Sequence, residues 1–154
     1  MNAYLAALQT ESLKAFRSKV PLFALLGFLI APLIGGLFMV ILKDPEAAKS
    51  MGLIGTKAQL SAGVADWPTF FNLLAQATAI GGAIIFAIVT TWVFGREFSD
   101  HTVKELLSLP TSREAIIAAK FTVIGFWTAA LTLLSYGLGL IIGNAVAIPG
   151  WTNE

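Results

Sequence analysis

Three long stretches of the chain contain no charged side chain. The first covers residues 20–42, and the apolar parts of the other two cover residues 70–94 and 121–147. A helix needs about 20 apolar residues to cross the hydrocarbon core of a bilayer. Only helices and closed barrels satisfy their backbone hydrogen bonds in lipid, and these stretches are too long and too continuous for barrel strands. The sequence therefore predicts three membrane-spanning helices.

The composition agrees with a bilayer as the solvent and argues against several kinds of chemistry. Of the 154 residues, 56% are hydrophobic and 12% are charged, against roughly 25% charged in average soluble domains. The net charge of +1 gives no reason to expect nucleic acid as a partner. Cysteine is absent and His101 is the single histidine, so neither a metal site nor a catalytic residue is predicted. The sequence has no phosphate loop of the form G-x-x-x-x-G-K-S/T, so neither ATP nor another cofactor is expected on this chain.

The expected fold is an all-α membrane protein, and the charges mark its segments. We predict an N-terminal interfacial amphipathic helix at 1–19, transmembrane helices at 20–42, 70–94 and 114–147, an extracytoplasmic loop at 43–69, a cytoplasmic loop with a short helix at 95–113, and the start of another extracytoplasmic loop at 148–154.

Basic residues predict the orientation of the chain, because lysine and arginine concentrate in cytoplasmic loops. They are denser before the first span and after the second than in the longer connection between them. The side chains concerned are Lys14, Arg17 and Lys19 on one segment and Arg96, Lys104 and Arg113 on the other. The N-terminus is therefore expected in the cytoplasm, with Trp92 near the inner interface.

Residues 1–19 have the pattern of a helix lying in the headgroup plane. Its broad apolar side comprises Leu5, Leu8, Leu13 and Phe16, and the charged residues elsewhere are Glu11, Lys14 and Arg17. The alternative is an ordinary solvated tail.

Small residues recur at every fourth position in the second and third spans. The expected helix-packing positions are Ala75, Ala79, Ala83 and Ala87 in the second span and Gly139 and Gly143 in the third. This spacing lets two helix backbones approach closely; alternatively, these residue types are simply common in membrane helices. Lys120, near the inner end of the third span, is expected to extend to the membrane surface.

The connection at 95–113 has the densest polar pattern in the chain. Thr102 and Glu105 have the spacing of a capping box, and so do Thr111 and Glu114. The first box starts a short helix that Pro110 ends, and the second box starts the third span. Such a helix, tied to two spans, presents a fixed surface to a partner.

The residues of this connection also carry a resemblance to a known family. The segment Gly95-Arg-Glu-Phe-Ser-Asp-His-Thr-Val-Lys-Glu-Leu-Leu-Ser-Leu-Pro-Thr-Ser-Arg113 resembles the signature of ABC-2-type transporter permeases. It is most similar to that of bacterial antibiotic-export and bacitracin-resistance permeases. The matching positions are Arg96, Glu97, Asp100, Thr102, Lys104, Leu106, Leu107, Pro110, Ser112 and Arg113.

The resemblance implies a subunit of an ATP-driven exporter in the bacterial cell membrane. The short helix would be a coupling helix seated on a separate ATP-binding-cassette ATPase, whose motions would rock the attached spans. Val103, Leu106 and Leu107 would supply apolar contact. Arg96, Glu97, Lys104 and Arg113 would supply steering or pairing; alternatively, these charges are merely solvated at the membrane edge, or the arginines anchor to anionic lipid. The exported compound is not indicated.

Two features depart from the family pattern. His101 stands where the family usually has glycine, so the turn before the short helix is expected to differ. Family permeases usually have six spans, and this sequence predicts three. The chain is therefore expected to be the N-terminal half of a permease, or to assemble with a second half or copy. The alternative function is a small three-span scaffold or accessory protein that does not itself transport.

Overall fold

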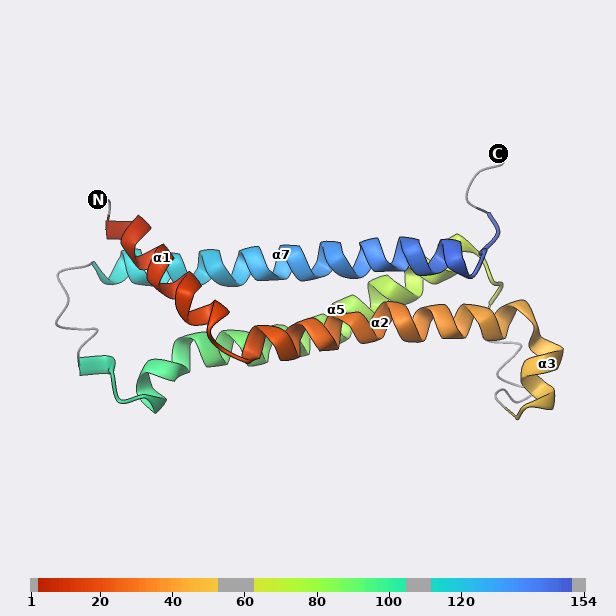
Figure 1. Cartoon of the computed structure of the whole chain (residues 1–154), viewed down its shortest axis with the longest axis horizontal. Helices are drawn as coiled ribbons and strands as arrows, with labels where there is room; N and C mark the ends of the chain where they lie inside the picture. The colour runs from red at the N-terminus through yellow and green to blue at the C-terminus, as the bar shows by residue number, and fades with distance from the viewer. Residues whose placement is uncertain (1–2, 53–62, 105–111, 151–154) are drawn as a thin grey trace. The chain divides into compact units, whose positions relative to one another are not determined.

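The structure is a computed structural model that describes residues 3–52, 63–104 and 112–150. Within these ranges the chain is all-α and contains no strand. Its helices, in chain order, are α1 (Ala3–Phe16), α2 (Val20–Lys43), α3 (Pro45–Ser50), α5 (Trp67–Ser99) and α7 (Arg113–Ala145) (Figure 1).

Three of these helices are long and apolar enough to cross a membrane, namely α2, α5 and α7. The expected fold class is thereby confirmed. All three extend beyond their uncharged runs. α2 ends at Lys43, α5 continues to Ser99 and so includes Arg96 and Glu97, and α7 begins at Arg113. Helical hydrogen bonding continues past the apolar stretch because charged side chains are tolerated once they leave hydrocarbon or find partners.

The contacts divide the chain into two units. Unit 1 comprises Met1–Gly27 and Gly82–Leu131, and unit 2 comprises Phe28–Gly81 and Thr132–Glu154. Each of the three long helices contributes one part to each unit.

Unit 2 has an apolar core built on aromatic side chains. Met39, Phe70 and Leu74 are almost fully buried, and Trp67 packs with them. Gly139 and Gly143 lie against this core, since a Cβ atom on Gly139 would be 2.5 Å from Leu74 Cδ1 and one on Gly143 would meet the Trp67 ring. These two glycines therefore allow α7 to approach the start of α5 closely.

In unit 1, the N-terminal segment is a helix packed on α7. Ala7 is buried with Ile116 and Ala119, and the Tyr4 hydroxyl lies 3.0 Å from the Thr122 hydroxyl. The solvated-tail alternative for this segment is therefore wrong.

Two helices end in the same motif, one in each unit. His101 and Ala147 have φ angles of 58° and 53°. The N–H of Thr102 donates to Glu97 O at 3.0 Å, and that of Ile148 to Gly143 O at 3.1 Å. A residue with left-handed backbone, followed by an N–H that donates to the carbonyl oxygen five residues earlier, forms a Schellman motif. Glycine is the usual residue at the left-handed position. The turn at His101 thus has the backbone conformation that favours glycine, although its side chain is bulky.

Side chains cap the starts of α3, α5 and α7. Asp44 Oδ1 accepts from the Ala47 N–H at 3.0 Å before α3. Asp66 Oδ1 accepts from the Thr69 N–H at 2.8 Å before α5, and hydrogen bonds from Thr69 lower the pKa of Asp66 below its ordinary 3.8. Ser112 Oγ accepts from the Ala115 N–H at 3.3 Å before α7. The serine therefore caps α7 in the described residues, whereas Thr111 and Glu105, members of the two expected capping boxes, lie outside them.

Candidate functional site

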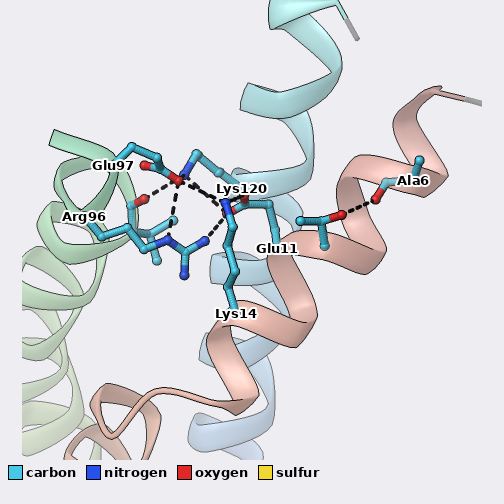
Figure 2. A network of polar contacts seen from close by, with 8 residues as sticks. Ala6, Glu11, Lys14, Arg96, Glu97 and Lys120 are labelled. Carbon is cyan, nitrogen blue, oxygen red and sulfur yellow. Dashed lines mark hydrogen bonds and ion pairs between the residues drawn. The ribbon is translucent and has the colours of Figure 1, made fainter. Parts of the chain in front are cut away.

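Five charged side chains from three helices of unit 1 form one connected group, which we call the charge cluster. Its members are Glu11 and Lys14 from α1, Arg96 and Glu97 from α5, and Lys120 from α7 (Figure 2). Glu11, Arg96, Glu97 and Lys120 are all buried. The cluster therefore joins the N-terminal helix to two candidate spans through charge-assisted hydrogen bonds.

Both carboxylates are shared by several cations. Glu97 Oε1 lies 2.7 Å from Lys120 Nζ and 3.4 Å from both Lys14 Nζ and Arg96 Nε. Glu11 Oε1 lies 3.0 Å from Lys14 Nζ, and Glu11 Oε2 contacts the Arg96 guanidinium. Each carboxylate thus connects its own helix to the other two: Glu11 connects α1 to α5 and α7, and Glu97 connects α5 to α1 and α7.

Lys120 is the most enclosed cation of the cluster. Its side chain is 4% exposed, and its ammonium group donates to Glu97, to Glu11 Oε2 at 3.3 Å and to the Val93 carbonyl oxygen at 2.8 Å. An ammonium group has three N–H donors, and these three acceptors match them. The expectation that Lys120 extends to the membrane surface is therefore wrong, because partners inside the protein replace water.

The cluster carries a small excess of positive charge. Three cations face two carboxylates, which leaves a formal charge of +1. Burying charges away from water is costly unless they are paired and hydrogen-bonded. Removing one partner from such a group typically costs about 3–5 kcal/mol, because the remaining charge stays buried and unpaired. The stability of unit 1 therefore depends on keeping each buried charge of the cluster in contact with its partners.

The charged and apolar sides of α1 have different surroundings. Glu11 faces α5 and α7, whereas Leu5, Leu13 and Phe16 are exposed. Sequence reasoning missed Glu11, Lys14 and Lys120 as site residues because each has an ordinary interpretation on its own helix. A lysine inside a span and an acid in the N-terminal helix were the available signals, but no pattern in one sequence pairs them across the chain.

A pocket of about 360 Å³ lies beside the charge cluster, and we call it the basic pocket. Its cations are Lys14, Arg17 and Arg96, and Arg96 also lies over the Trp92 ring at 5.0 Å. The remaining lining residues are Ser18, Glu97, Asp100 and Thr102.

The described positions that were expected to couple to an ATPase fall into three groups by burial, and the others lie outside the described residues. Arg96 and Glu97 are buried in the cluster, and Thr102 and Val103 are half-buried. The exposed positions are Asp100, Lys104 and Arg113. Leu106, Leu107 and Pro110 lie outside the described residues. The structure thus joins Arg96 and Glu97 to partners from α1 and α7, and it places Asp100 and Thr102 beside them in the lining of the basic pocket.

The expected packing positions also divide. Gly139 and Gly143 face the start of α5 within unit 2. All four alanines of the α5 stripe are exposed in the single chain: Ala75, Ala79, Ala83 and Ala87. A packing role for the alanines stays a prediction that requires a partner outside this chain.

Comparison with known proteins identifies the family. A family model described as an ABC-2 family transporter protein matches residues 7–153. The chain belongs to the ABC-2 transporter family. The bacitracin transport permease protein BCRB of Bacillus licheniformis is 34% identical to this ABC-2 chain over 75 residues, which are 49% of the chain and 36% of that relative. The aligned region of the chain thus spans little more than a third of the relative's length. No solved structure matches the chain.

These findings confirm the resemblance seen in residues 95–113. Together with the three candidate spans, they show a multi-pass membrane protein of the ABC-2 transporter family.

Proposed function

We propose that this chain is a permease subunit, or part of one, of an ATP-driven exporter in the bacterial cell membrane. Its N-terminus is cytoplasmic, and its connection at 95–113 docks on a separate ATP-binding-cassette ATPase. The observation that carries the proposal is the charge cluster, which ties α1, α5 and α7 together next to that connection.

The position of the cluster suits force transmission. Glu97 lies near the end of α5 at Ser99, and Lys120 lies two turns inside α7, which begins at Arg113. A displacement of the connection therefore acts first on the two helices that the cluster holds at fixed spacing. Rigid elements joined in this way can move together rather than deform separately.

The exposed charges suit docking on another subunit. Lys104 and Arg113 are exposed and have no ion-pair partner within the part of the chain that the structure describes. Charges of this kind steer association and set its register more than they add affinity. Leu106 and Leu107 would add apolar contact, as the family signature implies.

Two further partners complete the proposal. The α5 stripe of four alanines is uncovered in the single chain, which supports packing against a second permease half or a second copy. The cargo that we propose is bacitracin or a chemically similar compound, by similarity to the Bacillus licheniformis permease.

Co-purification tests the docking step. The Leu106→Asp and Leu107→Asp double variant should insert in membranes normally but lose the ATPase subunit that co-purifies with the unmodified chain. The matched control is Met51→Asp with Val64→Asp, two apolar residues that are each 70% exposed in the other connection. Normal recovery of the ATPase with the Leu106/Leu107 variant, or equal loss with both variants, would contradict the proposal.

A further inference from the structure

The basic pocket has a net positive charge that its own residues do not neutralise. Glu97 also lines it, but this carboxylate already accepts from three cations of the charge cluster. When Arg17 and Asp100 are added to the cluster, four cations face three carboxylates. The formal excess is +1, so a singly charged anion would balance the pocket.

The pocket also offers hydrogen-bond donors that are not used within the described residues. Arg17 is exposed and has no ion-pair partner among them. The bonds of Arg96 involve Nε and Nη2, which leaves the donors on Nη1. Ser18 Oγ accepts from the Val20 N–H at 3.1 Å, so its own O–H can donate. Several donors around one excess charge suit a phosphate group, whose oxygens accept from many directions.

The surroundings of the pocket suit a lipid. Ser18 precedes the start of α2 at Val20, and Asp100 follows the end of α5, so the pocket lies where two candidate spans end. Highly exposed aromatic residues neighbour its lining along the chain: Phe16 and Phe98 are 68% and 70% exposed. Trp92, within the lining, is of the type enriched at membrane interfaces. Exposed apolar rings near a basic pocket of about 360 Å³, which has room for more than a phosphate group, match a lipid headgroup with its acyl chains alongside.

We propose that the basic pocket binds a phosphate-ester monoanion, supplied by the headgroup of an anionic phospholipid such as phosphatidylglycerol. Arg17 supplies the cation that is free for the ligand, and Arg96 is held in place by Glu11 and Trp92. This site shares Arg96, Glu97, Asp100 and Thr102 with the 95–113 connection. Arg17 lies outside that connection, so a variant at Arg17 tests the pocket separately from ATPase docking.

Native mass spectrometry of the full chain in detergent micelles, titrated with defined lipids, tests the proposal. Phosphatidylglycerol should bind at lower concentration than zwitterionic phosphatidylcholine. Arg17→Gln should weaken phosphatidylglycerol binding about fivefold, as expected for one cation near an anionic headgroup. The matched control is Lys19→Gln, since Lys19 is an exposed cation two residues away that does not line the pocket. Both substituted residues are exposed, so the fold should be unaffected.

Competition distinguishes the sources of the phosphate. Millimolar glycerol 3-phosphate or inorganic phosphate is added to the unmodified chain and to the Arg17→Gln variant. If either compound displaces lipid from the unmodified chain but not the lipid that still binds to the variant, the pocket recognises the phosphate group itself. A soluble ligand then shares the site. If neither displaces it, the lipid is the ligand. Equal binding of the two lipids, or equal weakening by Arg17→Gln and Lys19→Gln, would overturn the proposal.

Discussion

Each unit contains a lysine that connects separate parts of the chain, but the two lysines have different surroundings. Lys120 connects α7 to α1 and α5, and Lys43 connects the end of α2 to the turn after α7. Lys120 in unit 1 is buried against two carboxylates and a carbonyl group. Lys43 in unit 2 is exposed and donates to the carbonyl oxygens of Val146 and Ala147 at 2.7 and 3.2 Å. The apolar core of unit 2 would remain packed without its lysine. The helices of unit 1 are joined by buried ion pairs, whereas those of unit 2 pack through aromatic side chains.

The difference teaches where specificity resides in this permease. Apolar packing tolerates exchange between residues of similar volume. A buried charge group tolerates much less, because removing one member leaves buried charged groups without a partner. Unit 1 carries the ends of α5 and α7 that lead into the 95–113 connection. The geometry of those ends is therefore fixed by directional bonds.

The largest expected effect comes from replacing each of the two lysines by methionine. Lys120→Met should lower the free energy of unfolding by about 3–5 kcal/mol, because Glu11 and Glu97 then lose a buried partner. Lys43→Met, the matched control, should cost less than about 1 kcal/mol, as for other solvent-exposed polar contacts. Equilibrium unfolding in mixed micelles measures both. Similar costs for the two variants would remove the distinction between the units.

The next effect probes the close approach of helices in unit 2. Gly139→Ala should destabilise by about 1–3 kcal/mol, because the added Cβ would be 2.5 Å from Leu74 Cδ1. Gly137→Ala in the same helix has nothing within 4 Å of the added atom, so it should be neutral or slightly stabilising. Thermal unfolding of the pair measures the difference. A harmless Gly139→Ala would show that α7 does not pack closely on α5.

A smaller effect is expected at the two Schellman motifs. Replacing His101 or Ala147 by glycine should stabilise the chain by about 1 kcal/mol, because a left-handed backbone costs little for glycine. Ser99→Gly, within the last turn of α5, should destabilise by about the same amount. Melting temperatures of the three variants provide the comparison. Destabilisation by His101→Gly would mean that the imidazole makes a contribution beyond its backbone conformation.

The smallest effect concerns the cap of α5 at Asp66. Because the pKa of Asp66 in the folded chain lies below the ordinary 3.8, the stability from its charged form is complete above that pH and is lost as the pH falls below it. Asp66→Asn should keep a pH-independent cap, whereas Asp66→Ala should cost about 0.5–1 kcal/mol above pH 4. Unfolding measured from acid to neutral pH tests this. A stability difference between the unmodified chain and the Asp66→Asn variant that does not vary with pH would rule out the titration.

Much of the fold could be predicted from one sequence, because the period and length of apolar runs are local properties. The runs ending at Leu42 and Phe94 predicted two of the spans, and the family signature followed from contiguous residues. The charge cluster could not be predicted, because Glu11, Glu97 and Lys120 are far apart along the chain. The contact between Glu11 and Arg96 was missed for the same reason, because the two residues lie on different helices.

A specific ionic bond between Glu97 and Lys120 joins α5 and α7 beside the 95–113 connection. A double-mutant cycle on Glu97 and Lys120, with Glu97→Gln, Lys120→Met and the double variant, tests it most directly. Their 2.7 Å contact predicts that the two substitutions are non-additive, with a coupling free energy of about 1–3 kcal/mol between them. Additive losses, within about 0.3 kcal/mol, would contradict the account.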